Sequence, residues 1–209
     1  MVEFIFKKIV LQLVITHKWA RNASELAEIA SKIESSSIFT HLHSKFIEGR
    51  FQHPELANDF SSWAKLNLDD APLSERFANI DIWHAKSIEE LREKIVSTCK
   101  DNLGHKVHEG EEFVFITAVP MIFNAEKRAY DLNSFINAIR KVDESSIFYH
   151  FLVSRFLNNK EDNEFSIYLD AIGERKISEN LRDFDPYDSI DLSSVREEII
   201  KVLEGSSYP

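Results

Sequence analysis

The sequence has few of the residues that most catalytic and cofactor-binding motifs require. It contains a single cysteine and five glycines in 209 residues. One cysteine cannot form an intrachain disulfide or a Cys-x-x-Cys motif. Phosphate-binding loops and the Gly-x-Ser-x-Gly elbow need glycines at fixed spacings that do not occur here. These absences argue against phosphoryl transfer and redox chemistry, and we predict no cofactor.

Long apolar runs are also missing, and no segment approaches the roughly 20 residues of a membrane-spanning helix. The segment 9–15 follows two lysines and resembles the core of a signal peptide. A similar segment, 118–123, lies in the middle of the chain where no signal acts, so we interpret both as structure. Cys99 takes an apolar position on a predicted helix, where it is expected to be buried. These features predict a cytoplasmic protein.

Clusters of positive charge are absent as well. The formal net charge is −10, with 13 basic and 15 acidic residues in 1–103 and with 12 and 20 in 104–209. Nucleic acids and anionic membranes bind proteins through clustered Lys and Arg, so both are poor candidate partners. The acidic second half instead predicts a basic protein partner, if the protein has a partner.

The clearest positive feature of the sequence is internal repetition. Ser36–His41 (SSIFTH) returns as Ser145–His150 (SSIFYH), and Phe4–Phe6 returns as Phe113–Phe115. Such self-similarity predicts a tandem duplication. We therefore predict a mainly α fold with short β segments, built from two similar helical domains of about 100 residues related by a pseudo-twofold axis. The predicted boundaries are a first repeat over 1–103, a linker over 104–110 and a second repeat over 111–209.

Each predicted repeat begins with an extended segment and continues with capped helices. Residues 2–15 and 111–123 are rich in Phe, Ile and Val, which favours short strands, and the two strands could pair with each other. Because the second segment contains Pro120, we expect that neither segment forms a long uninterrupted central strand or helix. The predicted helix N-caps are Asn22, Asn58, Ser87, Asp131 and Asp191.

The order of these segments resembles a known family. An aromatic strand, Ser-Ser-Ile-Phe-x-His, Asn-Asp/Glu-Phe-Ser, Asp-x-aromatic and a Glu/Arg-rich helix together resemble the prokaryotic domain-of-unknown-function family DUF5752, over nearly the whole chain. The most specific pieces are Ser146–His150 and Asp185–Tyr187. The first copy departs from them, with Thr40 in place of Tyr149 and Ile82–Trp83 in place of Pro-Tyr. The resemblance implies no established activity, and no catalytic residue is carried over from it.

Two histidines are the most informative polar positions. His41 and His150 recur on predicted helices that otherwise bury aromatic side chains. The favoured interpretation is structural, with each imidazole bonded to a backbone carbonyl or to the helix start at Asn58 or Asn163, because neither histidine has an identified catalytic partner. The alternative interpretation makes each histidine a general base or a ligand contact, since imidazole titrates near neutral pH.

A metal site is not predicted. His41 and His43 lie two residues apart and point in different directions on a helix, and the nearby Glu48 and His53 do not correct that spacing. The acidic residues of 183–191 lack the glycine and the terminal glutamate of a calcium-binding loop.

Taken together, these observations predict a non-enzymatic, cytoplasmic interaction or regulatory protein that binds another protein or its own copy. The aromatic residues Trp63, Tyr149 and Tyr187 join the two histidines and the two asparagines as candidate interface or ligand contacts. The alternative is a small-molecule-binding protein or enzyme with a pocket between the repeats, near His41 and His150.

Overall fold

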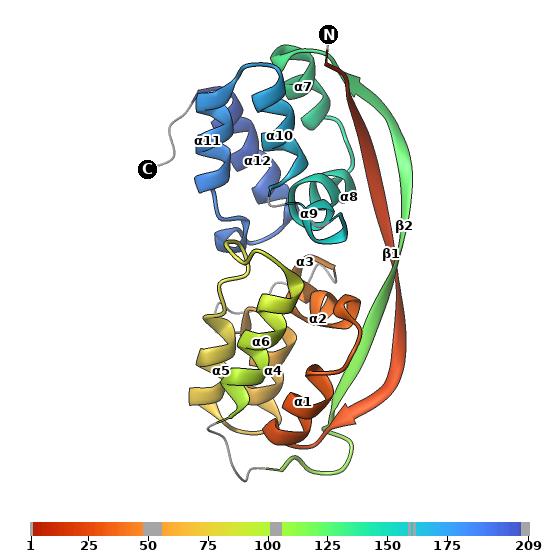
Figure 1. The fold of residues 1–209 in the computed structure, drawn as a ribbon, viewed down its shortest axis with the longest axis vertical. Coiled ribbons are helices and arrows are strands. Elements are labelled where there is room, and N and C mark those ends of the chain that lie inside the picture. Colours follow the sequence, from red (N-terminus) through yellow and green to blue (C-terminus); the bar gives the residue numbers. More distant parts are fainter. Residues whose placement is uncertain (1, 48–55, 101–105, 159, 161, 206–209) are drawn as a thin grey trace. The chain divides into compact units, whose positions relative to one another are not determined.

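The fold combines two long strands with two sets of helices. The computed structural model describes residues 2–47, 56–100, 106–158, 160 and 162–205. Strands β1 (Phe4–Ala20) and β2 (Phe113–Ala129) pair as an antiparallel two-stranded sheet (Figure 1). Each strand has 17 residues, about three times the usual strand length.

The length of these strands corrects the predicted fold class. The structure is 54% helix and 18% strand, which makes it an α/β fold. The prediction of a mainly α fold built by tandem duplication of a helical domain is therefore wrong. Pro120 does not limit the length of β2, because its side chain is exposed and a strand of a two-stranded sheet tolerates proline at positions that donate no hydrogen bond to a neighbouring strand.

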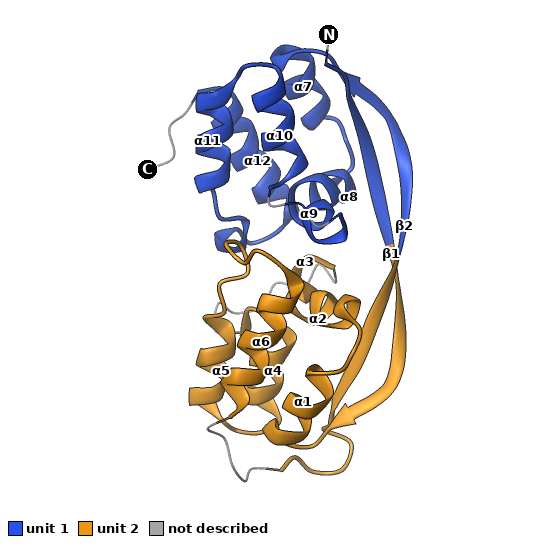
Figure 2. Cartoon of the chain, viewed as in Figure 1, with its two compact units in different colours: residues 1–10, 120–209 blue, residues 11–119 orange. Residues whose placement is uncertain are grey.

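The chain forms two compact units, and each strand contributes to both of them (Figure 2). Unit 1 consists of residues 1–10 and 120–209, and unit 2 consists of residues 11–119. The first ten residues thus belong with the C-terminal helices, and the start of β2 belongs with the N-terminal helices. Of the predicted linker 104–110, Gly104 and His105 lie outside the described residues.

The helices of the two units are short, and many of them begin at a polar residue whose side chain caps the first turn. Unit 2 contains α1 (Ala23–Ala30), α2 (Ser35–Leu42), α3 (Ser44–Ile47), α4 (Asp59–Leu66), α5 (Ala71–Ala78) and α6 (Ile88–Cys99). Unit 1 contains α7 (Leu132–Ile139), α8 (Glu144–Ile147), the π-helix η2 (Phe148–Val153), α9 (Ser154–Leu157), α10 (Glu164–Ala171), α11 (Arg175–Asp183), the 3₁₀-helix η3 (Pro186–Asp188) and α12 (Leu192–Leu203).

The predicted N-caps are confirmed. The side chain of Asn22 accepts a hydrogen bond from the Glu25 amide at 2.8 Å, and Asp131 accepts one from Ser134 at 2.7 Å. The side chains of Asn58, Ser87 and Asp191 cap α4, α6 and α12 in the same way. Each cap satisfies an amide that the first helical turn leaves without a partner, and such a cap typically stabilises a helix by about 1 kcal/mol.

The strand residues supply the aromatic centre of each core. In unit 1, the Phe6 ring stacks on Phe135 of α7 with centroids 5.6 Å apart, and Phe4 contacts the same ring at 5.3 Å. In unit 2, Phe113 of β2 stacks on Phe60 of α4 at 5.0 Å. Burying a phenylalanine contributes roughly 2–3 kcal/mol, so each helical unit depends on a strand segment from the distant end of its sequence.

Each strand is interrupted near one end by a residue in the left-handed conformation. His17 in β1 has φ 57°, and Glu126 in β2 has φ 56°. A non-glycine residue with positive φ inside a strand is typical of a β-bulge, which leaves backbone groups unpaired and increases the local twist. The regular hydrogen-bonding edge of each strand is therefore broken at this position.

Candidate functional site

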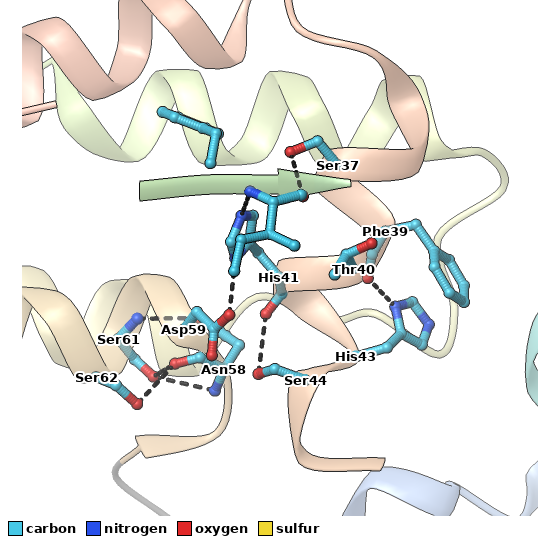
Figure 3. A network of polar contacts seen from close by, with 12 residues as sticks. Ser37, Phe39, Thr40, His41, His43, Ser44, Asn58, Asp59, Ser61 and Ser62 are labelled. Carbon is cyan, nitrogen blue, oxygen red and sulfur yellow. Dashed lines mark hydrogen bonds and ion pairs between the residues drawn. The ribbon is translucent and has the colours of Figure 1, made fainter. Parts of the chain in front are cut away.

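The first candidate site is built around His41, in the last turn of α2. Its Nδ1 lies 2.7 Å from Asp59 Oδ2, at the first residue of α4, and its Nε2 accepts a hydrogen bond from the Ile116 amide of β2 at 2.9 Å (Figure 3). Ser37 of α2 donates to the Ile116 carbonyl at 2.7 Å. One strand residue is thus held through both of its backbone groups by side chains from a single helix.

The second site has the same construction around His150 in the π-helix η2. Its Nδ1 lies 2.6 Å from Glu164 Oε2, at the first residue of α10, and its Nε2 accepts from the Lys7 amide of β1 at 2.7 Å. Lys160 Nζ also contacts Glu164, at 3.0 Å. In both sites a helix histidine joins the start of a second helix to the backbone of the strand.

The hydrogen bonds determine the protonation state of both rings. An imidazole nitrogen that accepts from a backbone amide carries no proton, so the ring proton lies on Nδ1 and is donated to the carboxylate. His41 and His150 are 2% and 1% exposed. Both nitrogens of each ring are engaged inside the protein, so this arrangement holds elements together and leaves no ring nitrogen to transfer a proton to a bound substrate.

Burial and charge shift the titration of the second site in a defined direction. Burial lowers the pKa of His150 below its ordinary 6.5, and the neighbouring Lys7 and Lys160 lower it further, against the opposing effect of Glu164. Burial alone would raise the pKa of Glu164, but the hydrogen bonds from His150 and Lys160, together with the charge of Lys160, hold it at about 2. The folded protein therefore favours a neutral imidazole beside an ionised carboxylate.

These shifts predict that unit 1 loses stability in two steps on acidification. A lowered histidine pKa contributes stability above pH 6.5 that is lost as the pH falls below that value. A lowered glutamate pKa contributes stability above pH 4.5 that is lost as the pH falls toward about 2. Urea unfolding at pH 7.5, 5.5 and 3.5 measures both steps. The H150F variant should lack the first step, and an equal loss in variant and wild type between pH 7.5 and 5.5 would contradict the assignment.

The predicted asparagines and the tryptophan are all buried at element junctions. Asn58 caps α4 and donates through Nδ2 to the Phe77 carbonyl at 2.9 Å. Asn163 caps α10 and donates to Ser166 Oγ at 2.9 Å. Trp63 of α4 donates through Nε1 to the Glu111 carbonyl at 3.0 Å. Asn58 and Trp63 thus lie in the same unit as His41, and Asn163 lies beside His150's partner Glu164.

The two predicted tyrosines do not form exposed contacts. Tyr149 is buried next to His150, with ring centroids 4.8 Å apart, and burial raises its pKa. Tyr187 lies in η3, where its amide donates to Asp185, and burial raises the pKa of its hydroxyl as well. Both tyrosines, like Trp63, are therefore placed to pack within their units.

Among the residues that the structure describes, no group of three or more potential metal ligands comes together. His43 Nδ1 contacts the Phe39 carbonyl of its own helix at 2.8 Å, and its ring stacks on Phe39. Glu48 and His53 lie outside the described residues. In the acidic segment, Asp185 accepts from the Tyr187 amide, and Asp191 caps α12.

The sequence interpretation missed the carboxylates and strand amides that complete the two sites. Asp59 and Glu164 directly follow the two predicted cap residues, so an acid after each asparagine, together with a recurring histidine, was the available signal. The strand partners Lys7 and Ile116 contribute only backbone groups. Every residue except proline has a backbone amide, so the sequence contains no signal that could have identified these two positions.

A different surface lies along the strands. Most residues in the middle of β1 and β2 are exposed although many are apolar. The exposed large apolar residues of the strands are Ile5, Val10, Leu13, Val14, Ile15, Trp19, Val114, Val119, Met121, Ile122 and Phe123. We call this set the exposed strand residues. Five belong to unit 1, and six belong to unit 2.

Comparison with known proteins places the chain in a family. The model of the family of unknown function DUF5752 matches residues 1–204 as one continuous span. The chain belongs to the DUF5752 family. No curated protein matches it. Within the described residues, no helix is both long and apolar enough to cross a membrane.

A solved structure has the same fold as this DUF5752 chain. It is described as the structure of OrfY from Thermoproteus tenax, and it is 26% identical with a TM-score of 0.89. The alignment covers 98% of this chain and 95% of OrfY. The long paired strands and the helices beside them are therefore shared with a protein whose description gives no activity.

Proposed function

We propose that this DUF5752 protein acts by binding another macromolecule, in a cytoplasmic setting, and that the exposed strand residues form the contact. The observation that carries the proposal is the exposure of apolar side chains along most of two 17-residue strands. Proteins rarely leave contiguous apolar patches in water unless these bind a partner, because the exposed surface costs free energy and favours aggregation.

The geometry of the histidines supports binding rather than catalysis. Each imidazole uses one nitrogen for a carboxylate and the other for a strand amide. A general base must reach the proton that it removes from a substrate, and these rings are occupied and buried. The predicted small-molecule site near His41 and His150 therefore gains no support from the geometry around either residue.

The experiment is site-specific photo-crosslinking in the native host. A benzoylphenylalanine at Ile15 or at Phe123 should form adducts with a distinct protein. The same group at Leu66, an apolar residue of α4 that is 70% exposed, serves as the matched control. Adducts at both strand positions that exceed those at Leu66 would support the proposal. Equal yields at all three positions, or no strand adducts, would refute it.

A further inference from the structure

The hydrogen-bonding edges and the charged residues of β1 and β2 indicate which class of partner the strands can bind. This inference rests on the proposed function, because it specifies what the exposed strand residues bind. An exposed two-stranded sheet can bind a partner in two ways: through its open hydrogen-bonding edges, or through its side chains.

Helix side chains occupy the edge of each strand at one position. The Lys7 amide of β1 is occupied by His150 in unit 1, and both backbone groups of Ile116 in β2 are occupied by α2 in unit 2. In the strand segments where these helix contacts are not made, the left-handed residues His17 and Glu126 interrupt the ladder. Bulges and covered edge positions disfavour strand addition, which favours the side chains as the binding surface.

The charge of the strands is opposite to that of the rest of the protein. β1 and β2 together carry five Lys or Arg and one Glu, whereas the whole chain has a net charge of −10. The exposed basic residues Lys8, Lys18, Lys127 and Arg128 lie among the exposed strand residues along the sequence, and Arg128 pairs with Glu3. The earlier prediction of a basic partner came from the composition of the second half and does not describe this surface.

We propose that the exposed strand residues bind an acidic segment of a partner protein that also carries apolar side chains. Complementary charge steers the encounter and apolar burial supplies affinity. Two strand surfaces from a second copy would bring lysines against lysines, which opposes self-association through this face. The net charge of −10 repels an anionic membrane from the molecule as a whole, whereas an acidic protein segment can contact the basic strands alone.

A tryptophan among the exposed strand residues can report binding through its fluorescence. Trp19 of β1 is 52% exposed, whereas Trp63 and Trp83, the remaining tryptophans, are each 5% exposed. A change in tryptophan emission on adding a ligand therefore reports mainly on Trp19. Lys18 is its sequence neighbour, and Lys65 of α4 offers an exposed lysine elsewhere in the same unit as a matched control.

The test is titration of the full chain with synthetic 20-residue peptides that combine Leu and Phe with either Asp and Glu or Lys. The acidic peptide should shift Trp19 emission to shorter wavelength, and rising salt should weaken its binding. K18E should weaken it by about threefold or more, whereas K65E, with the same change in net charge, should not.

Other outcomes would overturn the inference. Preferred binding of the Lys peptide, or equal effects of K18E and K65E, would exclude an acidic partner. A Trp19 shift caused by phosphatidylglycerol vesicles but not by the acidic peptide would assign the surface to lipid. A concentration-dependent shift without any ligand would assign it to a second copy. Each of these results leaves the crosslinking of Ile15 and Phe123 as an independent measure of the broader proposal.

Discussion

Replacing His150 with phenylalanine is expected to lower the free energy of unfolding by about 3 kcal/mol. Phenylalanine keeps the aromatic contacts with Phe4 and Phe165 but removes both hydrogen bonds. The Lys7 amide would be left without an acceptor, which costs about 1–3 kcal/mol at a buried position. Glu164 would lose one of its two donors and keep Lys160. Urea unfolding at pH 7.5 gives the difference.

The chain offers a matched control for this variant. His84 Nδ1 pairs with Asp81 Oδ2 at 3.0 Å, which is the same chemistry at a site where the histidine is 69% exposed. Exposed ion pairs contribute little, so H84F should change stability by less than about 0.5 kcal/mol. If H150F and H84F have equal effects, the buried histidine does not hold the strand in the way that the structure indicates.

Deleting residues 1–10 is expected to unfold helices α7–α12 while α1–α6 remain folded. The deleted segment supplies Phe4, Phe6 and Ile9 to the core of unit 1, together with the amide that His150 binds. Loss of one buried phenylalanine costs about 3–5 kcal/mol, so losing two exceeds the stability of many small domains. Unit 2 keeps its own strand segments, residues 11–20 and 113–119.

Hydrogen exchange followed by mass spectrometry locates the effect. Protection should fall in peptides from 132–203, more than a hundred residues from the deletion, and should persist in 23–42 and 59–99. The F6A variant is the milder companion and should raise exchange in the same C-terminal peptides. Increased hydrogen exchange confined to 11–42 would contradict the assignment of residues 1–10 to unit 1.

The sequence was sufficient for features set by neighbouring residues. The caps at Asn22, Asn58 and Asp131 follow from a polar side chain placed three residues before an amide that lacks a partner, which a local pattern contains. The apolar stripe of α6, ending at the buried Cys99, follows from helical periodicity in the same way.

Features that depend on distant residues could not be obtained in this way. The full length of β1 and β2 did not follow from the sequence, because their exposed middles lack a regular alternation of apolar and polar residues and Pro120 argued against a long strand in either segment. The pairing of β1 with β2 joins residues that lie about a hundred positions apart in the sequence. The histidines were identified as the polar positions of interest, but their partners come from another helix and from a strand backbone.

The packing of residues 1–10 with the C-terminal helices also affects folding during synthesis. Residues 1–10 leave the ribosome well before the helices that they complete, which end at Leu203. At about 5–20 residues per second, this segment waits roughly 10–40 seconds for its partners. During that interval its phenylalanines are open to chaperones and to premature aggregation. A bulky domain fused directly before residue 1 is therefore expected to interfere with folding of unit 1 before it affects unit 2.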